Sequence, residues 1–193
     1  MISSQNHILT MSGALLRVAS SLTKISNDLR WMNSGPVSGL SEITLKPLQP
    51  GSSIMPGKIN PVIPEAVLMA MAQVTGHHSA INIACISGNF QLNTMLPLIS
   101  KNIIESFNLL INSVYSLADT IDTFKVNKKN IQLNLEKNPI IATKLNETIG
   151  YDLASKIVKE AYKTNKSIID ITEEKTNLTR SQILKLLDPK KLI

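Results

Sequence analysis

A hydroxyl pair, a cation, an amide and a carboxylate lie within fourteen residues of Gly51, at Ser52, Ser53, Lys58, Asn60 and Glu65. Two glycines and four prolines are interspersed among these side chains, between segments that have helical periodicity. A stretch so rich in glycine and proline is typical of a constrained turn. We call residues 50–61 the Ser52 loop.

The residue types of the Ser52 loop favour proton transfer and anion binding. We expect Gly51 to leave backbone N–H groups free to face the Ser52 oxygen, and Lys58 adds a positive charge. Such groups stabilise a serine alkoxide, which can act as a base. Ser53 and Asn60 offer hydrogen bonds to a carboxylate. From the residues alone, the loop is either an anion site with an unusual serine or a purely structural turn.

Three other kinds of site fit the sequence less well. A phosphate-binding P-loop needs Gly, four residues and then Gly-Lys-Ser/Thr, whereas five residues separate the two glycines here and an isoleucine follows the lysine. A nucleophilic serine needs a histidine base, and nothing in the sequence ties His7, His77 or His78 to Ser52. The adjacent His77 and His78 would point in different directions on a helix, so we expect no metal site there.

Long helices are expected on both sides of the loop. Residues 3–33 and the residues from Pro97 to about Phe124 each carry an unbroken a/d heptad pattern. The first pattern consists of Ile8, Met11, Leu15, Val18, Leu22, Ile25, Leu29 and Met32, and the second of Ile103, Phe107, Leu110, Val114, Leu117, Ile121 and Phe124. Patterns of this length need partner helices, so we expect a helical bundle and an oligomer.

Shorter elements connect these helices. Residues 42–45 are expected to be extended. A second helix should begin between Pro61 and Pro64, with Asn60 as its cap, and run to about residue 83. Residues 87–93 are predicted to be the connector to the third helix.

The composition predicts an all-α protein in two parts. Only 4% of the 193 residues are aromatic while 43% are hydrophobic, so the core must be aliphatic, which suits packed helices. Residues 1–124 carry six basic and six acidic side chains, whereas residues 125–193 carry fourteen and eight and so account for the net charge of +6. We therefore expect a central helical bundle domain at 1–126 and a small C-terminal helical domain at 127–193. Helices are expected there at 128–137, 140–146 and 152–162, and a capping box at 179–182 should begin the last one.

Charge and cysteine content also bound the partners and the location. The basic excess is lysine-rich and not interleaved with aromatic residues, which favours a solvated surface over nucleic-acid binding. The single cysteine, Cys85, excludes a disulfide within the chain and favours a reducing, cytoplasmic location. The N-terminus does not resemble a secretory signal, and the longest apolar run, 66–72, is too short to span a membrane.

Residues 51–60, Gly-Ser-Ser-Ile-Met-Pro-Gly-Lys-Ile-Asn, match every defined position of the signature Gly-Ser-Ser-x-Met-Pro-x-Lys-x-Asn of the fumarase/aspartase superfamily. Residues 24–36, 60–66, 87–93 and 149–152 also resemble segments of class II fumarases. The chain therefore resembles the C-terminal part of a class II fumarase. This resemblance implies a long central helix bundle that forms the core of a homotetramer, followed by a small C-terminal helical domain.

The resemblance also implies roles for the loop residues. Ser52 matches the base that removes a proton from the carbon next to a substrate carboxylate, and Glu65 matches a carboxylate that supports the site. Ser53, Lys58 and Asn60 match contacts to the substrate carboxylates. The implied reaction is that of fumarate hydratase, the reversible anti-elimination of water from (S)-malate to give fumarate, a step of the tricarboxylic acid cycle. The implied partner is a small dicarboxylate, and no metal or cofactor is implied.

Two segments of the family have no counterpart in these 193 residues. They are the Thr-His segment that supplies the acid for the leaving group and an earlier Ser-Thr substrate-binding region. Since family active sites combine three subunits, we expect this chain alone to be nearly inactive. Two alternatives stay open: an aspartate ammonia-lyase of the same superfamily and an inert assembly fragment. Gly57 and residues 88–90 look more like a fumarase.

Overall fold

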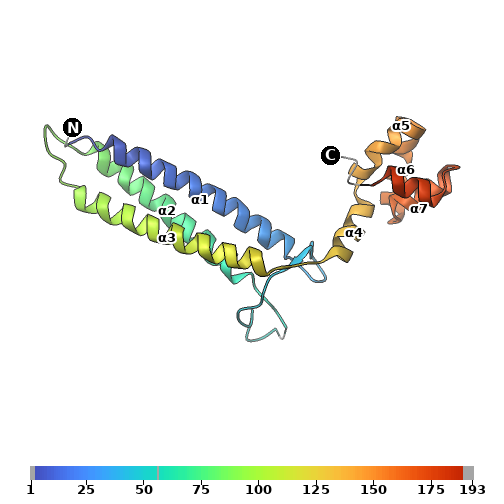
Figure 1. The fold of residues 1–193 in the computed structure, drawn as a ribbon, viewed down its shortest axis with the longest axis horizontal. Helices are drawn as coiled ribbons and strands as arrows, with labels where there is room; N and C mark the ends of the chain where they lie inside the picture. Colours follow the sequence, from blue (N-terminus) through green and yellow to red (C-terminus); the bar gives the residue numbers. More distant parts are fainter. Residues whose placement is uncertain (1–2, 56, 189–193) are drawn as a thin grey trace. The chain divides into compact units, whose positions relative to one another are not determined.

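The computed structural model describes residues 3–55 and 57–188, apart from the side chain of Lys137, so Pro56 of the Ser52 loop lies outside the described residues. The chain divides into two compact units, Met1–Val126 and Asn127–Ile193. Nearly all regular structure of the described residues is helical (Figure 1), which confirms the predicted all-α fold class.

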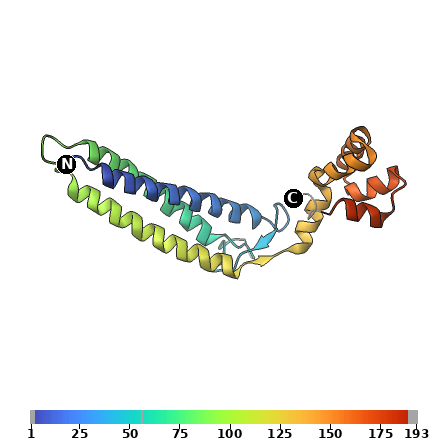
Figure 2. The same cartoon turned by 45° about the horizontal axis from the view of Figure 1, so that its top comes forward.

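Three long helices make up most of the first unit. They are α1 (Asn6–Met32), α2 (Val62–Ile86) and α3 (Leu96–Thr123), and they lie side by side in both views (Figures 1 and 2). The three predicted helices are therefore confirmed, with ends that differ by a few residues. The predicted cap of α2 is wrong, because the residue before the helix is Pro61 and no side chain caps its first turn.

The heptad patterns predict part of the buried face of the long helices, since heptad residues such as Leu22, Leu29 and Leu110 are buried. On α1, Val18 and Ile25 are 43% and 38% exposed, whereas Ala19 and Ser26 are buried. On α3, the buried positions include Ser106 and Ser113. Small side chains at these positions allow neighbouring helices to approach closely, and other heptad residues, such as Val18 and Ile25, turn outward. The prediction weighed large apolar residues only, so it missed the small residues that complete this face.

A short two-stranded sheet fixes the chain in front of the Ser52 loop. Strand β1 (Ile43–Thr44) pairs antiparallel with β2 (Lys125–Val126), which directly follows α3. The Leu45 backbone N–H also donates to the Asn33 side-chain oxygen, 2.9 Å away. The predicted extended segment is confirmed, and its two anchors hold the start of the loop against the ends of α1 and α3.

The connector between α2 and α3 is organised by Asn93, which is buried. Its side-chain nitrogen donates to the backbone oxygens of Ser3 and Ala84, at 3.2 and 2.9 Å, and its oxygen accepts the Met95 N–H. A Cβ at Gly88 would lie only 2.4 Å from the Ser3 oxygen, so this position requires glycine. The connector therefore ties the beginning of the chain to the turn.

The second unit contains six short helical segments among the described residues. They are α4 (Lys128–Lys137), the 3₁₀ turn η1 (Pro139–Lys144), α5 (Leu145–Ile149), α6 (Tyr151–Thr164), α7 (Ile168–Lys175) and α8 (Arg180–Leu186). The helices predicted at 128–137 and 152–162 and the Thr179 capping box are confirmed. The helix predicted at 140–146 is instead a 3₁₀ turn followed by one short helix. Helix α7 was not predicted.

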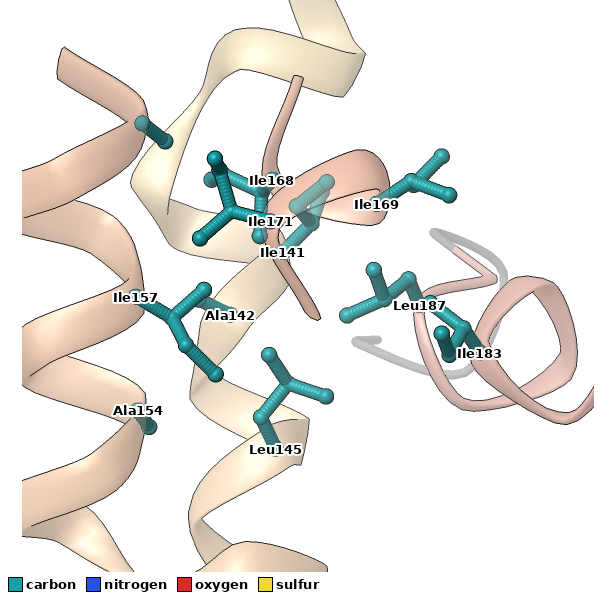
Figure 3. Close-up of a cluster of buried hydrophobic side chains, with 11 residues drawn as sticks. Ile141, Ala142, Leu145, Ala154, Ile157, Ile168, Ile169, Ile171, Ile183 and Leu187 are labelled. Carbon is teal, nitrogen blue, oxygen red and sulfur yellow. The ribbon is translucent and has the colours of Figure 1, made fainter. Parts of the chain in front are cut away.

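Aliphatic side chains fill the core of the second unit (Figure 3). Ala154 and Ile157 of α6 face Leu145 of α5 and the isoleucines of η1 and α7. Ser167 caps the start of helix α7, since its side chain accepts the Asp170 N–H, and the helix buries its first isoleucines in this core.

In the described part of the chain, no helix is long and apolar enough to cross a membrane.

Candidate active site

The Ser52 loop leaves the helical layer after β1 and rejoins it at the start of α2 (Figure 1). Two hydrogen bonds close it into a ring. The Gly51 N–H donates to the Lys58 backbone oxygen, 2.7 Å away, and the Asn60 side-chain nitrogen donates to the Gly51 oxygen, 3.0 Å away. Asn60, predicted to contact substrate and to cap α2, thus holds the base of the loop.

Only glycine fits at position 51. A Cβ added to Gly51 would lie 2.6 Å from the Lys58 backbone oxygen, closer than any relaxed contact allows. The two glycines of the loop differ in this respect, because Gly57 has a positive φ of 80° and open space around it. Close approach of backbone therefore selects glycine at position 51, and backbone conformation selects it at position 57.

Two backbone N–H groups converge on the Ser52 side-chain oxygen. Those of Ile54 and Met55 donate to it, with nitrogen–oxygen distances of 3.1 and 3.2 Å. The sequence predicted that Gly51 would leave N–H groups free to face this oxygen. The Gly51 N–H itself does not do so, because it donates to the Lys58 backbone oxygen. Donors at Ile54 and Met55 stabilise negative charge on the serine oxygen in the same way. Their backbone positions carry no signal in the sequence, so the prediction missed them.

The remaining candidate residues are less constrained. Ser53 and Lys58 are exposed, and within residues 3–55 and 57–188 no hydrogen bond or ion pair engages the Ser53 hydroxyl or the Lys58 ammonium group. Glu65 is half-buried in the first turn of α2. Among the described residues no hydrogen bond joins its carboxylate to the loop. The structure therefore brings Gly51, Lys58 and Asn60 together, and leaves Ser52 and Glu65 without a direct link.

Glu65 faces a pocket of about 390 Å³ that the sequence did not indicate. Ile59 and Pro61 of the loop line one side of this pocket, and Arg30 and Trp31 of α1 line another. Trp31, the single tryptophan of the chain, is 69% exposed. Arg30, Trp31 and Glu65 thus combine a cation, an indole and a carboxylate that are suited to bind a polar group. In the sequence, only the place of Arg30 and Trp31 at the end of the first predicted helix indicates that they lie near the loop.

His77 and His78 contact the neighbouring helices and not the loop. His77 Nδ1 lies 3.1 Å from the Ser106 oxygen of α3, and His78 Nδ1 lies 2.8 Å from the Ser12 oxygen of α1. The Ser106 hydroxyl donates to the Asn102 backbone oxygen, so it accepts its hydrogen bond from His77. Ser106 is also buried, which makes this pair a structural contact and not a nucleophile with its base.

Other reactive groups also lie apart from the loop. The buried Cys85 thiol donates to the Gln5 backbone oxygen, 3.6 Å away, and burial raises the pKa of this thiol. Within the described residues, no cluster of three His, Cys, Asp or Glu side chains is suited to hold a metal ion. The Cys85 thiol therefore adds no group to the Ser52 loop or to the pocket beside Glu65.

Two family models match the chain. Residues 1–76 match the model described as lyase, and residues 141–193 match the model described as fumarase C C-terminus. A fumarate hydratase class II from Pseudomonas aeruginosa is 52% identical over 193 residues, which is 100% of this chain and 42% of that protein. One from Xylella fastidiosa is 51% identical over 189 residues, or 97% of this chain and 40% of that protein. The chain thus spans about two-fifths of these relatives.

Solved structures show the same similarity. A fumarate lyase/delta-crystallin from Brucella melitensis superimposes with a TM-score of 0.92 at 40% identity, covering 98% of this chain and 41% of that chain. A class II fumarase from Schistosoma mansoni gives a TM-score of 0.87 at 34% identity, covering 98% of this chain and 40% of that chain. Both units of the described chain therefore have counterparts in known folds.

Proposed function

Since the chain belongs to the class II fumarase family and corresponds to its C-terminal part, we propose that it supplies the base-bearing part of a fumarate hydratase active site. The reaction is the reversible hydration of fumarate to (S)-malate. The observation that carries this proposal is the pair of N–H donors from Ile54 and Met55 on the Ser52 oxygen. A serine oxygen held in this way is suited to bear negative charge and to act as a base.

In the proposed mechanism, the Ser52 oxygen takes a proton from the carbon next to a malate carboxylate. The electron pair left behind spreads onto that carboxylate, where Lys58, Ser53 and Asn60 bind the added charge. Each such donor is worth about 3 kcal/mol in comparable oxyanion sites. The carbon–oxygen bond then breaks, and the hydroxyl group leaves as water after it receives a proton. Glu65 supports the site from the first turn of α2.

The acid that protonates the leaving hydroxyl comes from outside the described residues in this proposal. His77 and His78 are engaged with Ser106 and Ser12 in the helix layer. They also follow Glu65 by three helical turns of α2, about 18 Å along its axis. A second chain or another segment therefore has to complete the site.

We propose that the second chain is another copy of this protein, in a homotetramer. Outward-facing apolar residues recur at heptad spacing on α3, at Ile104, Phe107, Ile111, Val114 and Ile121. Helix α2 supports the same conclusion, because Glu65 is the one acidic or basic residue, histidines aside, of its 25 residues. A helix with so few charged residues is suited to burial on more than one side. Further helices packed against these faces would supply it.

A complementation assay tests the proposed function. The chain is co-expressed with the part of the Pseudomonas aeruginosa relative that it does not span, and fumarate is followed by ultraviolet absorbance as malate is supplied. We expect activity only in the combination. Replacing the base, Ser52→Ala, should lower the rate about a hundredfold to ten-thousandfold. Ser100→Ala, an exposed serine of α3, is the matched control and should leave the rate unchanged.

Each other result has a defined meaning. Full activity of Ser52→Ala would show that Ser52 is not the base, and activity of the chain alone would show that no outside acid is needed. Aspartate formed from fumarate and ammonium would favour the ammonia-lyase. Assembly without any activity would favour an inert fragment.

We also propose a cytoplasmic location, which the single free thiol, Cys85, supports.

A further inference from the structure

A second pocket, of about 450 Å³, is lined by Asn60 but by no other group that defines the proposed reaction. Its walls come from the chain that follows β1, from the first turn of α2 and from the last turns of α3. The volume falls within the range of about 300–1,000 Å³ that is usual for small-molecule sites. Its size therefore suits a compact organic ligand.

One part of this pocket is apolar. Leu45 and Leu48 follow β1, and Val62 and Ile63 begin α2. Together with Pro61 and Pro64 they offer aliphatic surface on two sides. Burying an apolar group against such surface contributes about 25 cal/mol for each Å² removed from water. The pocket is thus suited to hold an apolar side chain.

Two opposite charges line the same pocket from different elements. Lys46 comes from the segment after β1, and Asp119 comes from α3. The structure shows no ion pair between them, nor with any other described residue. The hydroxyls of Thr120 and Thr123 donate to backbone oxygens of α3 and present only acceptor lone pairs beside Asp119. The lining of the pocket therefore includes one group that favours a cation and one that favours an anion.

We propose that this pocket binds a free amino acid with a large apolar side chain. The ammonium group would lie against Asp119 and the threonine oxygens, the carboxylate against Lys46, and the side chain against the leucines and α2. A dicarboxylate fits poorly, because its second carboxylate would face Asp119. The site is therefore different in ligand class from the proposed active site, and the proposal does not depend on the fumarase reaction.

Three probes separate the contributions of the two charges. They are L-phenylalanine, phenethylamine, which has no carboxylate, and 3-phenylpropanoate, which has no amine. Binding to the full chain is measured by isothermal titration calorimetry. We expect L-phenylalanine to bind more tightly than either analogue, since a charged hydrogen bond to each end is worth about tenfold in affinity.

Two variants should respond in a crossed pattern. Asp119→Asn is expected to weaken L-phenylalanine and phenethylamine about tenfold and to leave 3-phenylpropanoate unaffected or improved. Lys46→Gln is expected to weaken L-phenylalanine and 3-phenylpropanoate and to spare phenethylamine. Asp122→Asn is the matched control, because Asp122 lies one turn further along the same helix and does not line the pocket. It should change none of the three affinities.

The proposal is overturned by any of three results. The first is no binding of L-phenylalanine, which would also be the result if another copy of the chain covers this pocket. The second is equal weakening of all probes by both variants, which would indicate a general structural effect. The third is binding that Asp122→Asn reduces as much as Asp119→Asn. None of these readouts depends on catalysis, so they leave the test of the proposed function separate.

Discussion

Among its described residues, the C-terminal unit buries an aliphatic cluster of eleven side chains, and several ion pairs, such as that of Asp170 with Arg180, lie on its surface. The three long helices of the first unit differ. Besides aliphatic residues they bury small and polar side chains, among them Ser12, Ser26, His77 and Ser106, and they expose bulky apolar ones. The Ser26 hydroxyl is buried without a hydrogen-bond partner in the described chain. The second unit therefore has an aliphatic core of its own, while the first unit exposes apolar faces that the proposed assembly of copies would cover.

Breaking the outward apolar face of α3 should have the largest effect. Ile111 is exposed in the isolated chain, and Ile111→Lys would bury an unpaired charge in the proposed interface between copies. We expect each buried lysine to weaken the association between copies by about 3–5 kcal/mol, so the oligomer should be lost. Sedimentation velocity measures the change in assembly directly.

A neighbouring position provides the control for that change. Asn112 is also exposed on α3 but belongs to the polar side of the helix. Asn112→Lys adds the same charge and should leave the assembly intact. If the unaltered chain is monomeric, or if both variants dissociate equally, the contrast between the two units is wrong.

The core of the second unit should show the next largest effect. Ile157 is fully buried on α6, and Ile157→Ala leaves a cavity that costs about 2–5 kcal/mol. Urea unfolding followed by circular dichroism should show an earlier transition of this unit. Trp31 lies in the first unit, so its fluorescence midpoint should stay unchanged. A joint shift of both signals would show that the two units unfold together.

Exposed isoleucine in the same unit gives the matched comparison. Ile140 is exposed in η1, so Ile140→Ala should change the free energy of unfolding by no more than about 0.5 kcal/mol. A cost similar to that of Ile157→Ala would mean that the core of Figure 3 is not what stabilises the unit.

The Ser52 loop belongs to neither core, and two hydrogen bonds close its base. In Gly51→Ala the new methyl group collides with the Lys58 backbone oxygen and separates Gly51 from it. We expect a local cost of about 1–3 kcal/mol, seen as roughly tenfold faster tryptic cleavage after Lys58. Neither unfolding midpoint should move. Gly76→Ala, where an added Cβ meets nothing within 4 Å, should leave the cleavage rate unchanged.

The same contrast explains what the sequence could and could not predict. Helices as long as α1 and α3 follow from periodicity, and the Thr179 capping box follows from two side chains at fixed spacing. Only part of the buried face of α1 followed, because Ala19 and Ser26 carry little apolar area and only close packing makes them core residues. Pairing of β1 with β2 joins residues about 80 positions apart and leaves no local pattern.

The site was predictable to a similar degree. Residue types identified Ser52, Lys58 and Asn60 as a group, and the structure joins Asn60 and Lys58 through Gly51. The donors to the Ser52 oxygen are backbone groups of Ile54 and Met55. Every residue except proline has such a group, so only the path of the chain reveals which ones converge. The predicted roles of these side chains in catalysis stay predictions.

The smallest effect is expected from a surface charge pair of the second unit. The Asp170 carboxylate lies 2.9 Å from Arg180, and a hydrogen bond to Ser167, followed by the Arg180 contact, lowers the pKa of Asp170. A carboxyl group with a lower pKa in the folded state stabilises the fold above its unfolded pKa of about 3.9 and loses that contribution as the pH falls through the folded value. The Asp170 side chain is 42% exposed, so solvent screening limits the contribution to less than about 1 kcal/mol.

Asp170→Asn should therefore lower the urea midpoint of the second unit slightly near neutral pH and bring no difference at about pH 2. Asp152→Asn, an exposed carboxylate without an ion pair in the described residues, should change the midpoint less at either pH. A large loss in Asp170→Asn would mean that charge pairing, and not the aliphatic cluster, holds this unit together.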